Sequence, residues 1–265
     1  MVSMLSAEQC DRFIEEGFVR LDDAFPSSIA ARARETFFHD LRAQGITEDP
    51  ATWTRPVVRL GMYAQPHIVA AASTPRLHTA LDQLVGPGAW LPCRAVGTVP
   101  VRFPSATDPG DTGLHIDVSF GGDPADFLSW RANVHSRGRA LLMLFLFSDI
   151  GAEDAPTRIR VGSHRDMAHA LAPAGEAGLS LGELLPLIAG APAREEVQAT
   201  GPAGTVYLCH PFLVHAAQVH RGTTPRFLAQ PPLLPVVDRW LPEGPGADYP
   251  VAQAITQATR APQPA

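Results

Sequence analysis

The sequence predicts a mainly β domain, a sandwich or a barrel, with helices flanking it. Short apolar runs recur between clusters of Gly, Pro and Asp through the central part of the chain, a spacing typical of all-β sandwiches and barrels. The run from Leu141 to Phe147 lacks any polar alternation, which indicates a central strand buried on both faces. Before residue 90 the pattern changes to amphipathic helical segments.

The first predicted helix covers residues 5–16. Ser6 is placed to cap it, Gln9 occupies the capping-box position, and Gly17 ends it. The remaining elements expected in this part are the apolar strand 18–21 and the helices 27–42 and 74–86.

Seven apolar runs are the strand candidates: 94–103, 114–120, 140–147, 157–161, 205–208, 213–217 and 227–234. The stretch from Gly121 to Gly138 is long for a hairpin loop and contains Phe127, Trp130 and His135. It is either a lid or a segment packed on the outside of the barrel. Residues 167–193 are expected to be partly helical, with 181–188 as the best helical stretch.

We interpret residues 1–265 as a single domain, with a mostly helical part (1–90), a β-barrel core (94–234) and a frayed tail (253–265). No signal peptide pattern opens the chain, and no apolar run is long enough to span a bilayer. The three cysteines, Cys10, Cys93 and Cys209, form no CxxC pair, which favours a reducing compartment. We therefore expect a cytoplasmic protein without a membrane partner.

All 21 basic residues are arginines, so the chain contains no lysine. This excludes Schiff-base chemistry on lysine, a pyridoxal-phosphate anchor and a P-loop. Together with abundant Ala, Gly and Pro, it suggests GC-rich coding and a bacterial source. The net charge of −6 gives no basic footprint for nucleic acid.

The sequence His115-Ile116-Asp117 is the first candidate for chemistry. On an extended strand, side chains at i and i+2 point to the same face, so this spacing puts an imidazole beside a carboxylate. A second imidazole from a distant strand would complete a facial triad of two histidines and one carboxylate, the ligand set of non-heme Fe(II) oxygenases.

A distal segment contains His210-Pro211, then His215, then Arg226 eleven residues later. It resembles the distal motif of the phytanoyl-CoA dioxygenase-like family of Fe(II)/2-oxoglutarate-dependent oxygenases. Residues 5–21 also resemble the family's N-terminal helix and strand, and residues 160–165 resemble its Pro-Gly-Ser-His turn. Three positions depart from the family pattern: Val161, Ala217 and His220.

The resemblance implies a double-stranded β-helix, or jelly roll of the cupin type. It implies that His115, Asp117 and His215 bind Fe(II), and that 2-oxoglutarate chelates the metal while Arg226 holds its 5-carboxylate. His210, the rival for the third ligand, then packs beside the site. The implied reaction uses O2 to oxidise a C–H bond, usually by hydroxylation, and releases succinate and CO2. Desaturation, epoxidation or ring formation are alternatives, whereas Asp117 argues against halogenation.

For three further site residues, the sequence is compatible with either a functional or a structural role. Arg226 holds the co-substrate or forms a surface salt bridge. Thr157 lies near the co-substrate or is an ordinary core threonine. Arg102 contacts the co-substrate or an anionic substrate, or forms a structural salt bridge. Ser163 and His164 are expected to shape a turn.

Two other functions remain open: a Zn(II)-dependent hydrolase that uses the same triad, and a non-enzymatic cupin-like binding protein. The substrate is expected to be a small, partly hydrophobic metabolite, as in natural-product tailoring, bound in a cavity lined by Phe127, Trp130 and the apolar strands. The arginines 131, 137 and 139 are candidates for the phosphates of a CoA substrate. The sequence leaves the oligomeric state open.

Overall fold

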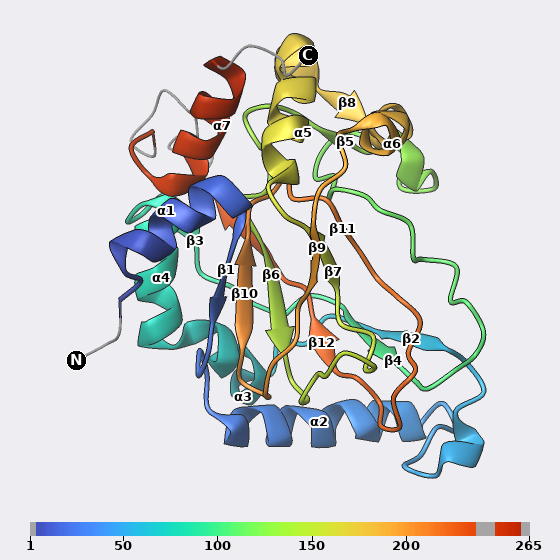
Figure 1. Cartoon of the computed structure of the whole chain (residues 1–265). Coiled ribbons are helices and arrows are strands. Elements are labelled where there is room, and N and C mark those ends of the chain that lie inside the picture. The colour runs from blue at the N-terminus through green and yellow to red at the C-terminus, as the bar shows by residue number, and fades with distance from the viewer. Residues whose placement is uncertain (1–3, 237–246, 261–265) are drawn as a thin grey trace.

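Two antiparallel sheets form the centre of the molecule in the computed structural model, which describes residues 4–236 and 247–260 (Figure 1). The main sheet has the order β1 (Phe18–Leu21), β10 (Val206–Cys209), β6 (Leu141–Leu146), β13 (Pro232–Pro235) and β3 (Trp90–Leu91), and β12 (Leu228–Ala229) also pairs with β6. The second sheet is β11 (His215–Ala216), β7 (Arg158–Arg160) and β9 (Glu196–Gln198). Two strand pairs complete the set: β2 (Val57–Leu60) with β4 (Val99–Arg102), and β5 (Arg131–Ala132) with β8 (Leu179–Ser180).

Strand β6 is the centre of the main sheet, and all six of its residues are buried. Alternate residues face opposite ways because side chains alternate along a strand. Met143 and Phe145 join the cluster under the helices, whereas Leu144 and Leu146 join the cluster between the two sheets. The prediction of a strand buried on both faces is therefore confirmed.

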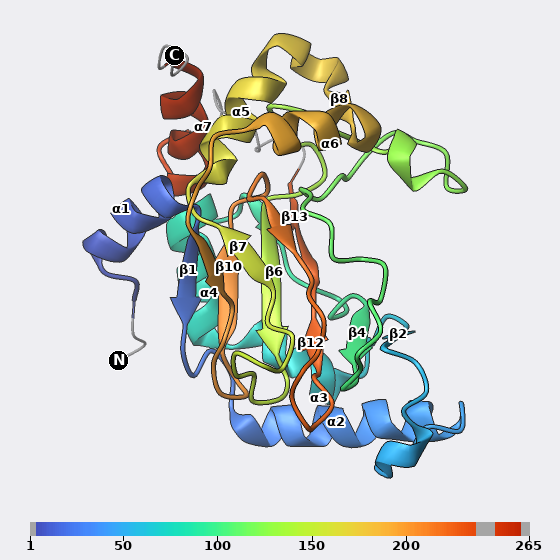
Figure 2. The same cartoon turned by 45° about the vertical axis from the view of Figure 1, so that its right-hand side comes forward.

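Helices cover the outer face of the main sheet and one end of the molecule (Figures 1 and 2). The helices α2 (Ser27–Arg42), α3 (Pro66–Val69) and α4 (Pro75–Val85) pack against the sheet through buried aromatic and aliphatic side chains. The helices at the end are α1 (Ala7–Glu16), α5 (Ser163–Leu171), α6 (Leu181–Gly190) and α7 (Pro250–Arg260). Four short 3-10 turns complete the described elements: η1 (Pro50–Thr52), η2 (Ala70–Ser73), η3 (Phe127–Ser129) and η4 (Ala172–Ala177).

The predicted N-terminal capping of α1 is confirmed. The Ser6 hydroxyl accepts a hydrogen bond from the Gln9 N–H, and the Gln9 side chain accepts one from the Ser6 N–H. Gly17 ends the helix in the left-handed region with φ = 88°.

The prediction of a frayed tail from residue 253 is wrong as far as residue 260. Residues 250–260 form α7, whose Val251 and Ile255 are buried against α1, α4 and α5. Apolar residues at helical spacing hold this segment on the domain, because their burial offsets the entropy of ordering it. Residues 261–265 lie outside the described part of the chain.

The predicted fold class is correct about the strands, but it underestimates the helical content. The described chain is mixed α/β with antiparallel sheets. Many strands are shorter than the apolar runs that predicted them. The run 227–234 is split into β12 and β13 around Gln230 and Pro231, and the run 114–120 makes only isolated bridges. Proline lacks the N–H that a ladder needs, which accounts for the first break.

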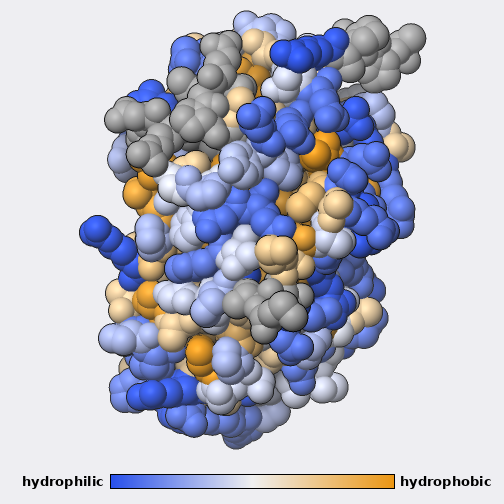
Figure 3. All heavy atoms as spheres, turned by 90° about the vertical axis from the view of Figure 1, so that its left-hand side faces the viewer, coloured by the Kyte–Doolittle hydropathy of each residue, from blue (hydrophilic) through white to orange (hydrophobic). Residues whose placement is uncertain are grey.

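None of the described helices is both long and apolar enough to cross a membrane. The face of the molecule turned toward the viewer in Figure 3 is mostly hydrophilic, with small apolar patches among polar side chains. Such scattered apolar residues are ordinary for a protein surface.

Candidate metal centre and co-substrate pocket

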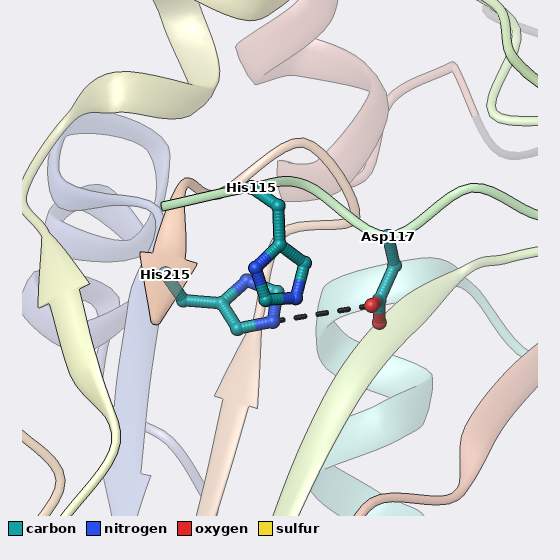
Figure 4. A group of neighbouring side chains, drawn as sticks. All are labelled: His115, Asp117 and His215. Atoms are coloured by element: carbon teal, nitrogen blue, oxygen red, sulfur yellow. Dashed lines mark ion pairs between the residues drawn. The ribbon is translucent and has the colours of Figure 1, made fainter. Parts of the chain in front are cut away.

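His115, Asp117 and His215 meet beside β11, an edge strand of the second sheet (Figure 4). One candidate ligand atom from each of these residues lies within 4.8 Å of the other two. His115 and His215 are paired across an antiparallel bridge, with N–H to C=O distances of 3.0 Å in both directions. This bridge brings together two segments that are a hundred residues apart, so the predicted triad is formed by the fold.

The two imidazoles are oriented for metal binding. The Nδ1 of His115 donates to the Gly113 carbonyl at 2.9 Å, and the Nδ1 of His215 donates to the Leu213 carbonyl at 3.0 Å. Because a carbonyl can only accept, Nδ1 carries a proton in both rings, so in the neutral form of either ring the lone pair that can bind a metal is on Nε2. Burial, and then the neighbouring His115, lower the pKa of His215 to about 4, which keeps that imidazole neutral at pH 7.

Asp117 is held by a cation that the sequence analysis did not assign to it. The Nη1 atom of Arg139 lies 3.0 Å from Asp117 Oδ2, and Asp117 Oδ1 faces His215 Nε2 at 3.9 Å. Burial alone would raise the pKa of the Asp117 carboxyl, but Arg139 and the two histidines outweigh it, and the pKa lies below its usual value. Asp117 is therefore an ionised carboxylate beside two imidazoles, a donor set that fits Fe(II).

A cavity of about 600 Å³ opens beside the triad, and Arg226 and Arg102 line it. Arg226 is only 2% exposed. Its Nη1 donates to the Ala155 carbonyl at 2.6 Å and its Nη2 to the Pro100 carbonyl at 3.2 Å, while Nε is buried with no hydrogen-bond partner among the described residues. The surface-salt-bridge interpretation of Arg226 is therefore wrong.

Arg102 lies directly opposite Arg226, because the two residues form an antiparallel bridge. Arg102 Nη2 donates to both carboxylate oxygens of Asp111 at 2.8 Å, but its Nε and Nη1 are buried without a partner among the described residues. Burial, and then the charge of Arg102, lower the pKa of Arg226 to about 9. Because Asp111 also pairs with Arg59, the two buried guanidiniums keep unmet donors and positive charge, which an anionic ligand would satisfy.

The other predicted cavity residues divide into two groups. Thr157 is buried and lines the cavity, as does Ala217, where the resembling family often has a hydroxyl. Phe127 also lines it, which favours the lid interpretation of the 121–138 segment. Trp130 is absent from the lining and packs against the cluster beneath α5 and α6.

His210 is not part of the metal cluster. Its ring packs between Phe13, Phe212 and His164, with Nε2 donating to the Val251 carbonyl at 3.3 Å. The residues of the 160–165 turn are structural, as expected: the Ser163 hydroxyl donates to Arg160 O and accepts from Val214 N, and His164 Nε2 donates to Ile14 O. Cys209 is fully buried, and burial raises the pKa of its thiol.

Sequence reasoning missed the two side chains that organise the charged groups here, Arg139 and Asp111. Arg139 was a candidate for substrate phosphates, but it contacts Asp117 instead. Neither residue lies within a spacing motif that points to its partner, so only the tertiary contact reveals its role.

No protein-family model matches the chain, and no curated protein matches its sequence. Solved structures do match. EctD from S. alaskensis in its apo form is 22% identical, with a TM-score of 0.56 over 91% of this chain and 81% of that chain. HygX from Streptomyces hygroscopicus with nickel and 2-oxoglutarate bound is 20% identical, with a TM-score of 0.54 over 86% of both chains.

SnoK, a non-heme α-ketoglutarate-dependent carbocyclase from nogalamycin biosynthesis, is 19% identical, with a TM-score of 0.52 over 92% of this chain and 88% of that chain. The chain has the fold of these proteins. The likeness confirms the predicted double-stranded β-helix, and in these three comparisons it covers 86% to 92% of this chain. At such identities it establishes the fold, and the site has to be argued from its own residues.

Proposed function

We propose that the chain is an Fe(II)/2-oxoglutarate-dependent oxygenase that oxidises a C–H bond of a small molecule and releases succinate and CO2. One observation carries the proposal: the triad of His115, Asp117 and His215 lines the same cavity as Arg226. Arg226 is buried, and none of the described residues provides a carboxylate partner for it. A facial triad leaves three metal positions open, and a buried guanidinium needs an anion.

In this proposal the Nε2 atoms of His115 and His215 and the Oδ1 atom of Asp117 hold Fe(II). Their orientation is fixed before the metal arrives, because carbonyls hold both Nδ1 atoms and Arg139 holds Asp117 Oδ2. Preorganisation of this kind favours binding, since little side-chain entropy is lost when the metal enters.

Arg226 would hold the 5-carboxylate of 2-oxoglutarate. The carbonyls of Ala155 and Pro100 fix its guanidinium in place, and its unmet Nε is available to the ligand. Arg102, on the facing residue, supplies two further nitrogen atoms without a partner among the described residues, Nε and Nη1, and Thr157 lines the same cavity. We infer that both residues also contact the co-substrate.

When bound, iron with 2-oxoglutarate would supply the oxidising power, using O2 and the decarboxylation of the co-substrate. The chain's own tasks are to orient the co-substrate, to place a substrate C–H bond beside the metal and to keep water out. Leu114, Phe127 and Leu185 form an apolar part of the cavity lining suited to the last task.

The two arginines are what favours an oxygenase over a Zn(II) hydrolase on the same triad. A hydrolase needs a metal and a water molecule, and it has no use for two buried guanidiniums with unmet donors beside the metal. The same charges would be an unexplained cost in a binding protein for neutral ligands.

The decisive experiment is an anaerobic titration of the protein with Fe(II) and 2-oxoglutarate, following the weak metal-to-ligand charge-transfer absorption in the visible range. The expected band is lost in His215→Ala and weakened in Arg226→Ala. His39→Ala is the matched control, because His39 is an exposed histidine on α2. Tight Zn(II) binding with no band for Fe(II) and 2-oxoglutarate would overturn the oxygenase proposal in favour of the hydrolase.

A further inference from the structure

Exposed apolar side chains lie on two elements that border the metal cavity, η3 and α6. Among the described residues, eight large apolar side chains are exposed, and four of them lie on η3 and α6. Those four are Phe127 (61% exposed), Leu128 (52%), Leu185 (38%) and Leu187 (42%). Phe127 and Leu185 also line the cavity, and we call these two residues the mouth patch.

The mouth patch has a fixed place in the fold. The N–H of Leu181, the first residue of α6, donates to the Trp130 carbonyl at 2.8 Å, and β5 pairs with β8 just beside it. Arg131 reinforces this link, because its guanidinium donates to the carbonyls of Ala177 and Gly178 at 2.8 and 2.7 Å. The loop that contains η3 is therefore fastened to the helix that carries the rest of the patch.

The patch continues into the cavity. Phe127, Leu181 and Leu185 line the same space as the triad, together with Leu114. The charged lining of this cavity comes mainly from other elements: Arg59 on β2, Arg102 on β4, Asp111, and Arg226 before β12. One part of the lining is thus apolar and extends to the surface, and the charged lining residues lie mainly on other elements.

We propose that the substrate of this site has an extended apolar body, a hydrocarbon chain or fused rings, that rests on Phe127, Leu181 and Leu185 while one of its C–H bonds reaches the metal. This inference rests on the proposed function. Contact between an apolar wall and an apolar ligand is favourable, because both surfaces are removed from water. The same wall offers no hydrogen bonds to the hydroxyl groups of a polar ligand and would leave them unpaired. A sugar-like or zwitterionic substrate therefore does not fit this wall.

The occupant is a substrate because the patch and the metal share one cavity. The four exposed apolar residues outside η3 and α6 lie elsewhere, and Met62, Leu91 and Leu234 line a second apolar cavity at the edge of the main sheet. That second cavity contains none of the triad residues, so a test must distinguish the two places.

Neutral primary alcohols (hexanol, octanol and decanol) are suitable probes, since they bind through their apolar body and leave the arginines uninvolved. Mn(II) would occupy the triad as a paramagnetic reporter, and its own binding is first measured by electron paramagnetic resonance. Proton relaxation of the alcohol then reports only molecules bound near the metal. We expect binding near the metal to tighten about fourfold for each added methylene group, and sorbitol to show no enhanced relaxation.

Phe127→Ser and Leu185→Ser are each expected to weaken octanol binding near Mn(II) at least fivefold, with unchanged Mn(II) affinity. Leu234→Ser is the matched control, because Leu234 is a similarly exposed leucine (45%) in the second cavity. It is expected to leave the Mn(II)-dependent relaxation unchanged. Thermal melting of each variant checks that the fold is intact.

Failure of this inference is distinguishable from failure of the proposed function. If Mn(II) does not bind, or binds equally well to His215→Ala, the metal site itself is wrong. If Mn(II) binds normally but the alcohols show no chain-length dependence, the apolar-substrate inference is overturned while the metal site stands. The alternative occupant of the patch is a second copy of the chain, and sedimentation analysis tests it. A dimer that dissociates in Phe127→Ser would show that the patch joins two copies, which also overturns the inference.

Discussion

The guanidinium of Arg139 binds Oδ2 of Asp117 at 3.0 Å, whereas the other oxygen, Oδ1, faces His215 Nε2. A tight turn places the guanidinium there. The Ser136 hydroxyl donates to the Arg139 carbonyl, and Gly138 (φ = 82°) passes close to Ser119. Because one oxygen of Asp117 is occupied, only Oδ1 is left for a metal, and the carboxylate cannot easily chelate it with both oxygens.

Replacing Arg139 with Gln is expected to weaken Fe(II) binding about 10- to 100-fold, because partners that orient a metal ligand contribute that much affinity. The measurement is an anaerobic Fe(II) titration, supported by the absorption spectrum of the Co(II)-substituted protein, which reports the coordination number. Arg137→Gln is the control, since Arg137 is exposed, lies over the Phe120 ring and forms no ion pair with Asp117 among the described residues. Equal Fe(II) affinity in wild type and Arg139→Gln would show that the ion pair has no part in metal binding.

Arg102→Gln is expected to weaken 2-oxoglutarate binding roughly 10- to 100-fold, because a hydrogen bond to a charged group contributes about 1.5–3 kcal/mol. The comparison variant is Asp111→Asn, which breaks the ion pair with Arg102 but keeps its guanidinium. If Arg102 serves the co-substrate, Asp111→Asn weakens binding less than Arg102→Gln does. If Arg102 only pairs with Asp111, both variants lower stability and neither changes 2-oxoglutarate affinity, as measured by calorimetry with Fe(II) present and oxygen excluded.

Acid is expected to destabilise the fold through buried histidines. Burial lowers the pKa of His164 to about 4 and lowers the pKa of His210 well below its ordinary value. Each ring binds a proton more readily in the unfolded chain, so the free energy of unfolding falls as the pH drops from about 6.5 toward 4. For His164 the loss approaches about 3 kcal/mol.

The measurement is urea unfolding of the metal-free protein at a series of pH values. In His164→Gln the amide can still donate to the Ile14 carbonyl, but it cannot titrate, so the slope against pH should become shallower. His39→Gln, at an exposed position on α2, should retain the full slope. An unchanged slope in His164→Gln would contradict the assignment.

Gly17→Ala is expected to destabilise the protein by about 2–4 kcal/mol. Gly17 has φ = 88°, which costs an L-residue about 1 kcal/mol or more, and an added Cβ would collide with the His164 ring and with Leu213. In the His164→Ala background the collision with the ring disappears while the backbone cost remains. The penalty from thermal or urea unfolding should therefore shrink in the double variant but not vanish, and an unchanged penalty would rule out the collision.

Periodicity was sufficient for the elements that are stabilised locally. The helix 5–16 has its cap, its amphipathic face and its terminal glycine in the sequence, and the structure forms α1 accordingly. The strand 141–147 was equally predictable, because a run without polar residues can only lie in the interior. The segment 253–260 was misjudged because its partners on α1, α4 and α5 are distant in sequence.

The sequence by itself determined the chemistry available to this protein: two histidines and an aspartate with facial-triad spacing, an arginine eleven residues after His215, and no lysine. Tertiary structure alone decided which groups meet. It brought His215 to His115 and Asp117, paired Arg139 with Asp117, and set Arg102 opposite Arg226. The physical reason is that local spacing fixes which way a side chain points within its own element, whereas strand pairing and turns bring distant elements together, and their contacts lie far beyond any local pattern.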